Sequence, residues 1–235
     1  MAGARLRGTA GRGLIAPSAV WACDIDAAKL AALREELKIQ IAGSPAALCE
    51  RADAIVLALK PQQIDALMAE IAPQIAPRHL LISIAAGIPL ARIAKSLPAG
   101  TRLIRVMPNT PALVGLGAAG VARGEHATGA DLEAALALFG AVGIAIEVAE
   151  KDIDAVTAIS GSGPAYFFRI IELMQQAGEE LGLSPEVARQ LTLQTALGAA
   201  RMAADSDVDP AELRRRVTSP GGTTAAALGV FEERG

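Results

Sequence analysis

Short apolar runs alternate with helical stretches along the first two thirds of the chain. Residues 54–59 (AIVLAL) and 80–84 (LLISI) are almost continuously apolar, which is typical of strands buried on both faces of a parallel sheet. The alternation predicts a doubly wound α/β sheet of Rossmann type. Predicted strands cover residues 20–23, 54–59, 80–84, 102–106, 117–121 and 144–148, and predicted helices cover residues 26–37, 63–75, 89–97 and 131–139.

The pattern changes after Lys151, where apolar residues recur at helical spacing and no further strand is predicted. Ser184 followed by Pro185 is a typical helix start and predicts a long helix as far as Ala204. The chain is therefore expected to contain two domains, an α/β domain over residues 1–149 and an all-helical domain over residues 150–235.

A further pair of helices is predicted around a proline-glycine turn near the C-terminus. Asp209 has the features of an N-cap, with Pro210 and Glu212 in the first helical turn. The turn SPGG (219–222) ends this helix, because proline lacks an N–H donor and glycine permits positive φ. Thr223 and Thr224 then begin the second predicted helix.

Free N–H groups at the start of that second helix would suit an anion such as a carboxylate, and the two threonine hydroxyls lie beside them. On spacing alone, a corner between two helices with ordinary caps is the better explanation of the segment.

Composition and charge argue against several classes of function. The chain is 52% hydrophobic and only 3% aromatic, which predicts an aliphatic core. The net charge is −3 and the longest basic run is Arg214–Arg216, so nothing indicates nucleic-acid binding. There is no uncharged apolar run long enough to cross a membrane, and the N-terminal residues lack the apolar core of a secretory signal. A cytoplasmic protein is expected.

The cysteines and histidines do not form a metal-binding pattern. Cys23 and Cys49 have neither ligand spacing nor a disulfide framework, so we interpret them as packing residues in a reducing compartment. His79 and His126 have no partner cluster in the sequence. No metal site is predicted.

Two strings match the glycine motif of dinucleotide-binding loops, GRGLIA (11–16) and GLGAAG (115–120). The first follows no predicted strand, and Pro17 leaves no room for a helix. The second follows a proline-rich turn and continues into strand-like residues. We interpret neither as a cofactor loop.

Several stretches together resemble the pyrroline-5-carboxylate reductase family, which catalyses the last step of proline biosynthesis. The resemblance extends in order from Gly13 to Gly235. The stretches are residues 210–232 (PAELRRRVTSPGGTTAAALGVFE), residues 105–111 (RVMPNTP), Asp154 with residues 160–166 (SGSGPAY), Lys60-Pro61 and residues 83–87 (SIAAG).

This resemblance implies a Rossmann-type cleft that binds NADPH or NADH. The residues that it places along the cleft are Ala58, Leu59, Lys60, Pro61, Ile84, Ala85 and Ala86, with Met107, Pro108 and Asn109 in a loop that faces the nicotinamide. Each set also has a plainer interpretation. Lys60-Pro61 would simply end a strand with its lysine in solvent, and Asn109 would be a turn residue.

Asp24 lies after the second strand of the expected fold, where such folds place the residue that binds the adenosine ribose. A carboxylate there accepts hydrogen bonds from a 2′-hydroxyl and repels a 2′-phosphate. Alternatively Asp26 is the helix N-cap and Asp24 is only a polar loop residue.

The family resemblance implies reduction of the C=N bond of 1-pyrroline-5-carboxylate to give proline. Thr224 would be the catalytic residue, bonding the ring nitrogen, while Ser219, Gly221, Gly222 and Thr223 hold the substrate carboxylate. The helical half would pair with a second subunit, giving a homodimer or a larger homo-oligomer. The segment SGSGP (160–164) would permit close helix crossing there, although a simple glycine-proline kink explains it as well.

The family pattern also includes a strand with a glycine loop before the residues that match here, and a further helix after Gly235. We expect that strand to lie between the strands at Val20 and Ala54, and residues 1–235 without it to bind neither nucleotide. The alternatives to an active reductase are a truncated, inactive dimerising remnant and another Rossmann-type imine or 3-hydroxyacid reductase. The latter group would normally have a lysine in the helical half, and none lies between Lys151 and Gly235.

Overall fold

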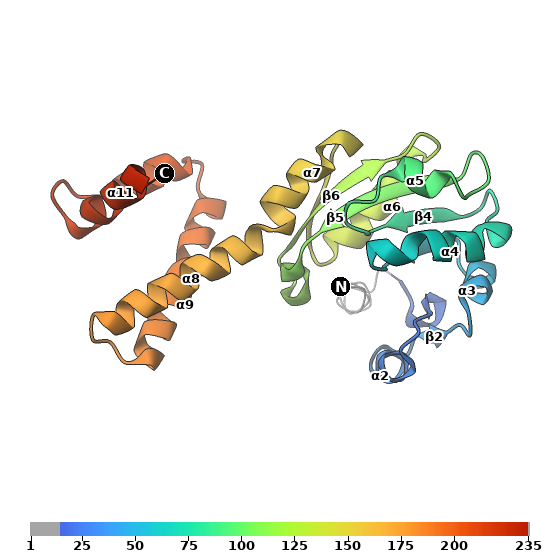
Figure 1. Cartoon of the computed structure of the whole chain (residues 1–235), viewed down its shortest axis with the longest axis horizontal. Coiled ribbons are helices and arrows are strands. Elements are labelled where there is room, and N and C mark those ends of the chain that lie inside the picture. The colour runs from blue at the N-terminus through green and yellow to red at the C-terminus, as the bar shows by residue number, and fades with distance from the viewer. Residues whose placement is uncertain (1–14, 235) are drawn as a thin grey trace. The chain divides into compact units, whose positions relative to one another are not determined.

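The computed structural model describes residues 15–234, which belong to two compact units divided between Ala165 and Tyr166 (Figure 1). The glycines Gly11 and Gly13 of the first glycine motif lie outside the described residues. The first unit contains the strands, and the second is helical.

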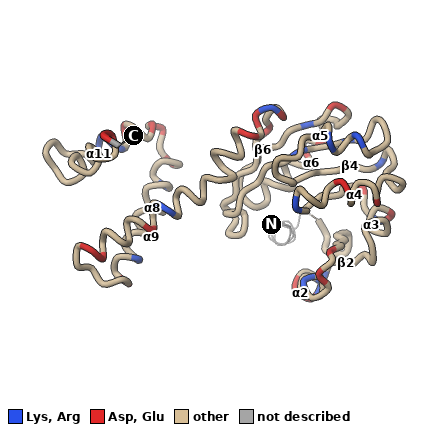
Figure 2. Tube along the Cα trace, in the orientation of Figure 1, with Lys and Arg blue, Asp and Glu red and all other residues tan. Residues whose placement is uncertain are grey.

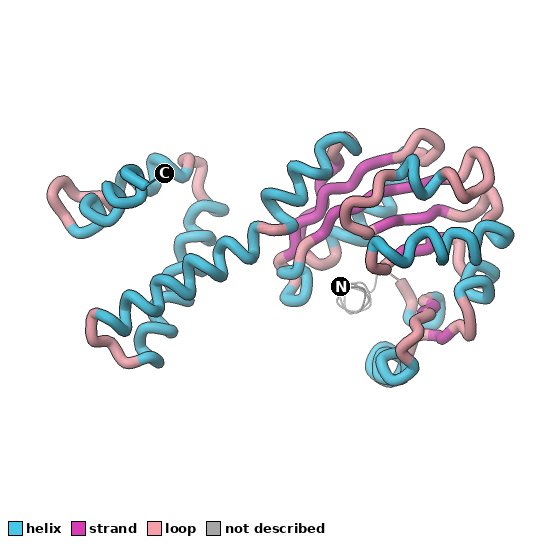
Figure 3. The backbone as a smooth tube through the Cα atoms, viewed as in Figure 1, coloured by secondary structure: helices cyan, strands magenta, loops and turns pink. Residues whose placement is uncertain are grey.

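A five-stranded sheet in the order β3-β4-β5-β6-β7 forms the centre of the first unit (Figure 3). Strands β3, β4 and β5 are parallel, as predicted, and β6 pairs antiparallel with β5 but parallel with β7. The strands are β3 (Ala54–Leu57), β4 (Leu80–Ser83), β5 (Arg102–Pro108), β6 (Gly117–Arg123) and β7 (Gly143–Glu147). Their positions confirm the strands predicted from the apolar runs.

Two short strands, β1 (Trp21–Ala22) and β2 (Gln40–Ile41), form a separate parallel pair. Within the described residues β3 is therefore an edge strand, and β1 and β3 belong to different sheets. The sequence pattern did not predict β2, because two residues are too few to show a period.

The first unit contains helices on both faces of this sheet, together with one that packs on the β1-β2 pair. They are α2 (Ala27–Leu37), α3 (Pro45–Arg51), α4 (Ile64–Ile71), α5 (Leu90–Ala94), α6 (Gly129–Gly140) and α7 (Ile153–Val156). Helix α3 was missed, although Ser44 caps it by accepting a hydrogen bond from the Ala47 N–H at 3.1 Å. The predicted helix 63–75 is shorter than expected, because Pro73 falls in a 3-10 turn that follows α4.

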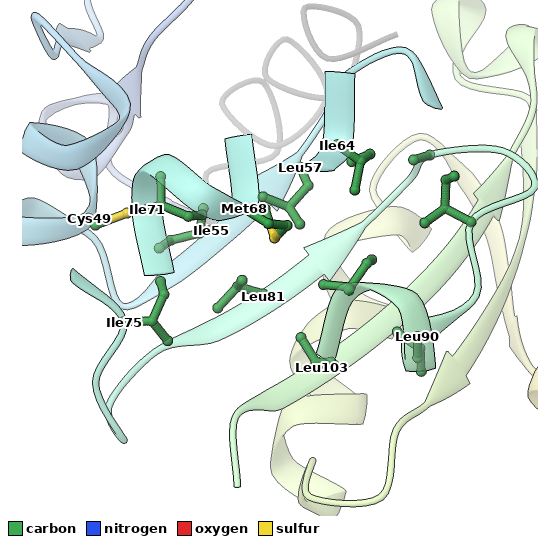
Figure 4. Packing of buried hydrophobic residues seen from close by; sticks show 13 residues of the cluster. Cys49, Ile55, Leu57, Ile64, Met68, Ile71, Ile75, Leu81, Leu90 and Leu103 are labelled. Carbon is green, nitrogen blue, oxygen red and sulfur yellow. The ribbon is translucent and has the colours of Figure 1, made fainter. Parts of the chain in front are cut away.

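The core consists of two apolar clusters separated by the sheet. Successive residues of β4 and β5 point to opposite faces, so Leu81 and Leu103 join one cluster while Ile82 and Ile104 join the other. Figure 4 shows the first cluster, in which α4 packs on β3 and β4. Almost all members are aliphatic, which confirms the expectation from composition.

The second unit consists of most of α8 together with α9, α10 and α11. Their bounds are α8 (Gly163–Glu180), α9 (Pro185–Asp205), α10 (Pro210–Arg216) and α11 (Thr223–Arg234). Ser184 and Asp209 cap α9 and α10, as predicted. The residues described contain no strand after Glu147, in agreement with the sequence pattern, and none of their helices is long and apolar enough to cross a membrane.

Large apolar side chains of the helical unit remain exposed. Phe167, Phe168, Leu191, Leu197 and Met202 are all more than half exposed. Figure 2 shows the charged residues of α8 and α9 at separate points along these helices rather than in one block. Within α10, Arg215 and Arg216 both pair with Glu212 on an exposed helix face. The basic run at 214–216 thus behaves as an ordinary solvated surface.

His79 is a fully buried polar residue in the core of the first unit. Its Nδ1 accepts a hydrogen bond from the Ala76 N–H at 2.9 Å, and its Nε2 lies 2.9 Å from the Cys49 carbonyl oxygen. Since Nδ1 is an acceptor, Nε2 carries the proton and donates. His79 therefore joins the end of α3 to the turn that leads into β4.

We expect His79→Ala to lower the free energy of unfolding by about 2–4 kcal/mol, because the Ala76 N–H loses its acceptor and a cavity forms. Urea denaturation measures the change. The matched control is His126→Ala, in an exposed loop, which should stay within about 0.5 kcal/mol of wild type. Equal effects of the two substitutions would contradict a structural role for His79.

Candidate active site

Three loops leave the same edge of the sheet. The register pairs Leu57 with Ser83 and Ser83 with Arg105, so the carboxyl ends of β3, β4 and β5 lie together. A hydrogen bond of 3.2 Å from the Ile84 N–H to the Leu57 carbonyl extends this alignment into the loops. Eight of the residues expected along the cofactor cleft lie in these loops: Ala58, Leu59, Lys60, Pro61, Ile84, Ala85, Ala86 and Asn109. Met107 and Pro108, which were expected in a loop, are instead the last two residues of β5, because the strand continues to pair with β6 there.

The loop residues differ in exposure. Ala58, Lys60 and Ala86 are exposed, whereas Ala85 and Asn109 are buried. Small side chains at this edge leave the backbone open to a ligand, and the ends of parallel strands are where open α/β sheets bind ligands. The arrangement therefore fits a dinucleotide.

Asn109 has a definite structural contact as well. Its Oδ1 accepts a hydrogen bond from the Ala118 N–H at 2.8 Å, and its side chain is almost completely buried. This bond ties the end of β5 to the start of β6. Gly115 between them adopts positive φ (76°), and Gly117 and Gly120 lie within β6. The second glycine motif thus leads into a strand instead of a helix, as predicted.

Asp24 follows β1 and keeps part of its side chain exposed. Its Oδ1 accepts a hydrogen bond from the Asp26 N–H at 3.1 Å, and its other oxygen pairs with Lys29. The hydrogen bond from Lys29, against some desolvation, holds the pKa of the Asp24 carboxyl below its ordinary value, so the group is ionised. Asp26 caps α2 through the Lys29 N–H at 3.0 Å, so both aspartates have local partners.

A second group of site residues lies in the helical unit, between α10 and α11. The Gly222 N–H donates to the Ser219 carbonyl at 3.0 Å, with Pro220 and Gly221 between them. Gly221 has φ of 69°, so the turn has proline second and a left-handed glycine third, as type II turns require. This turn ends directly at the first residue of α11.

The N-terminal end of α11 exposes several hydrogen-bond donors to solvent. Thr223 and Thr224 are the first two residues of this 12-residue helix, and both are exposed. The first N–H groups of any helix have no acceptor within the helix, and the helix dipole favours an anion near them. Ser219 and Gly221 are exposed beside them, and Gly222 is half-buried. The arrangement can hold a small carboxylate.

Sequence reasoning missed a polar link beneath the cofactor edge. Arg105 on β5 is buried and pairs with Glu150 at 3.4 Å, while the same Glu150 oxygen accepts a hydrogen bond from the Leu90 N–H at 2.7 Å. Asp154 lies 3.8 Å from the same guanidinium. Arg105 falls inside the RVMPNTP stretch, but its partners Glu150 and Asp154 are 45 or more residues away in the sequence. No local pattern therefore predicts the contact.

The two groups of residues belong to different compact units, and each is described by itself. In the part of the chain that the structure describes, no cluster of three or more His, Cys, Asp or Glu side chains could hold a metal ion. The arrangement thus offers a dinucleotide edge in one unit and an anion-binding helix start in the other.

Comparison with known proteins identifies both parts. Residues 150–235 match the family model of pyrroline-5-carboxylate reductase dimerisation, and residues 1–87 match the model of NADP oxidoreductases that depend on coenzyme F420. A pyrroline-5-carboxylate reductase from Pseudomonas aeruginosa is 50% identical over 215 residues, which are 91% of this chain and 79% of that protein.

Solved structures agree with the sequence matches. A pyrroline-5-carboxylate reductase from Coxiella burnetii superimposes with a TM-score of 0.91 at 37% identity, covering 99% of this chain and 86% of that one. The Plasmodium falciparum pyrroline carboxylate reductase, solved with NADP bound, gives a TM-score of 0.85 at 31% identity and covers 98% and 85%. The chain belongs to the pyrroline-5-carboxylate reductase family, the NAD(P)H-dependent oxidoreductases of proline biosynthesis.

Proposed function

We propose that this protein reduces 1-pyrroline-5-carboxylate to proline, with the substrate carboxylate held at the start of α11. The observation that carries the proposal is the turn from Ser219 to Gly222, which delivers two threonines to the first positions of that helix. When bound, the dihydronicotinamide supplies the hydride for the carbon of the protonated C=N bond, and the cofactor is thereby oxidised.

Each residue of the turn has a specific task. The Ser219 hydroxyl and the first N–H groups of α11 bind the carboxylate, with Thr223 completing the set. Gly221 and Gly222 keep the turn tight, since a Cβ on Gly222 would lie 3.2 Å from the Ser219 carbonyl oxygen. The carboxylate is thus fixed relative to the helix axis, which orients the ring.

Thr224 is the catalytic residue of the proposal. Its hydroxyl oxygen accepts a hydrogen bond from the ring N–H and so holds the imine in its protonated, electrophilic form until the amine has formed. A protonated cyclic imine needs no separate acid or base, so orientation and exclusion of water are the main contributions of the chain. This requirement explains why the turn over residues 219–224 contains neither histidine nor a carboxylate.

The cofactor lies along the edge formed by the loops after β3, β4 and β5. Ala58–Pro61 and Ile84–Ala86 line the dinucleotide, while Met107, Pro108 and Asn109 face the nicotinamide. Asp24 hydrogen-bonds the adenosine ribose, and we expect NADH to be accepted at least as well as NADPH.

We also propose the domain boundary between residues 149 and 150, where the dimerisation model begins to match. The exposed apolar side chains of α8 and α9 favour burial against a second copy of the chain, giving a homodimer or a larger homo-oligomer. Free thiols at Cys23 and Cys49 fit a reducing compartment, so we propose the cytoplasm. Formation of proline from pyrroline-5-carboxylate and NADPH, by a chain with both ends of the family pattern restored, tests the reaction, and inactivity of that chain would contradict it. The kinetic tests below use the same restored chain.

For Thr224→Ala we expect kcat to fall about 10- to 150-fold, because one hydrogen bond to a charged group is worth ~1.5–3 kcal/mol. Steady-state kinetics measures the change. Thr224→Ser keeps the hydroxyl and should retain most of the activity. Full activity of Thr224→Ala together with an inactive Ser219→Ala would show that the roles are assigned wrongly.

For Asp24→Ser we expect the ratio of kcat/KM for NADPH to that for NADH to rise about tenfold or more. The substitution removes a charge that repels the 2′-phosphate and releases Lys29 to bind it. The control is Asp26→Ser, which preserves a capping hydroxyl and should leave the ratio unchanged. An unchanged ratio in Asp24→Ser, with NADPH strongly preferred throughout, would mean that Asp24 does not contact the ribose.

A further inference from the structure

The segment from Glu150 to Gly161 packs on one face of strands β5 and β6. It includes the η5 turn (Glu150–Asp152), α7 and a π-helical turn, η6 (Thr157–Gly161). Alternate residues of β5 point to the same face, and Arg105 and Met107 both contact this segment. Figure 1 shows α7 alongside β5 and β6.

In this packing Gly161 lies against the end of the Met107 side chain. A Cβ placed on Gly161 would lie 2.6 Å from the Met107 Cε, well inside van der Waals contact. The other near atoms belong to Thr157, at 3.5 and 3.8 Å. Because φ of Gly161 is not positive, its backbone conformation does not itself require glycine. What requires glycine here is the space that the methionine end occupies.

The π-helical turn brings the Gly161 backbone to that position. The Ser162 N–H bonds to the Thr157 carbonyl at 2.8 Å, five residues back, so the helix is one residue wider here than an α-helix. Such turns are rare and occur frequently at functional sites. Two side-chain hydrogen bonds support it, from Thr157 to the Ile153 carbonyl at 2.8 Å and from Ser160 to the Val156 carbonyl at 3.0 Å.

We propose that Gly161 is a positioning residue, whose missing side chain sets where the Met107 thioether lies beside the nicotinamide. The inference rests on the proposed function, in which Met107, near the end of β5, faces the nicotinamide. Met107 is only partly buried, and methionine has a flexible side chain that moves at low energetic cost. A methyl group on Gly161 therefore moves the thioether by about 1 Å, out of a 2.6 Å contact and into ordinary contact, and leaves the fold intact.

Kinetics of three variants tests the proposal. Gly161→Ala should lower kcat about 10- to 100-fold, since a misplacement of about 1 Å can cost two orders of magnitude, while the KM for pyrroline-5-carboxylate changes little. In the Met107→Ala background, which has no thioether to displace, the same Gly161→Ala change should have no further effect. The matched control is Gly129→Ala, an exposed helical glycine whose added Cβ meets no atom within 4 Å; it should behave as wild type.

A spectroscopic readout does not depend on activity. With ¹³C-labelled methionine methyl groups, the Met107 resonance is assigned by its loss in Met107→Ala. It should shift in Gly161→Ala, and it should also shift when NADPH is added to the restored chain that has no other substitution. The resonance of Met68, which belongs to α4 and is buried in the first core cluster, serves as the internal reference and should not move.

The outcomes separate the inference from the function on which it rests. An unshifted Met107 resonance in Gly161→Ala, or equal kcat losses from Gly161→Ala with and without Met107, overturns the positioning role alone. Wild-type kinetics of Met107→Ala, or a Met107 resonance that does not shift when NADPH is added, overturns the placement of Met107 at the nicotinamide. A shift in Gly161→Ala combined with kinetic coupling to Met107 supports the proposal.

Discussion

Parallel hydrogen bonding among β3, β4 and β5 is the constraint on which the cofactor edge depends. The register aligns Leu57, Ser83 and Arg105, so the loops that follow the strands leave the sheet at a common edge. The register in turn depends on burial, because a shift by one residue would exchange Leu81 and Ile82 between the two core clusters. Apolar packing on both faces of the sheet therefore fixes the relative positions of three loops that are far apart in the sequence.

Long-range polar contacts then hold the loops and turns that the sheet alone leaves free. His79 joins α3 to the turn before β4, Asn109 joins the ends of β5 and β6, and Glu150 joins Arg105 to the start of α5. Each of these side chains meets at least one backbone group. A buried backbone N–H or carbonyl without a partner costs free energy, so these contacts both satisfy the backbone and restrict it.

The substrate turn is organised differently, since its geometry is almost entirely local. Asp209 caps α10, Pro220 and Gly221 determine the turn, and Thr223 begins α11 within a few residues. Local sequence is sufficient here because turn type depends on which residues tolerate positive φ or a missing donor. The exposed apolar side chains of α8 and α9 contrast with this local order, because nothing within their own unit covers them.

The sequence by itself determined the alternation of strands and helices, the caps at Ser184 and Asp209, and the turn before Thr223. All of these depend on neighbours within one or two helical turns or on the period of apolar residues. It did not reveal β2, the reversal of direction between β5 and β6, the partners of Arg105 or the contact of Met107 with Gly161. Only the tertiary structure decided these features, because they depend on which distant segments pack together, and no local period or spacing records that choice.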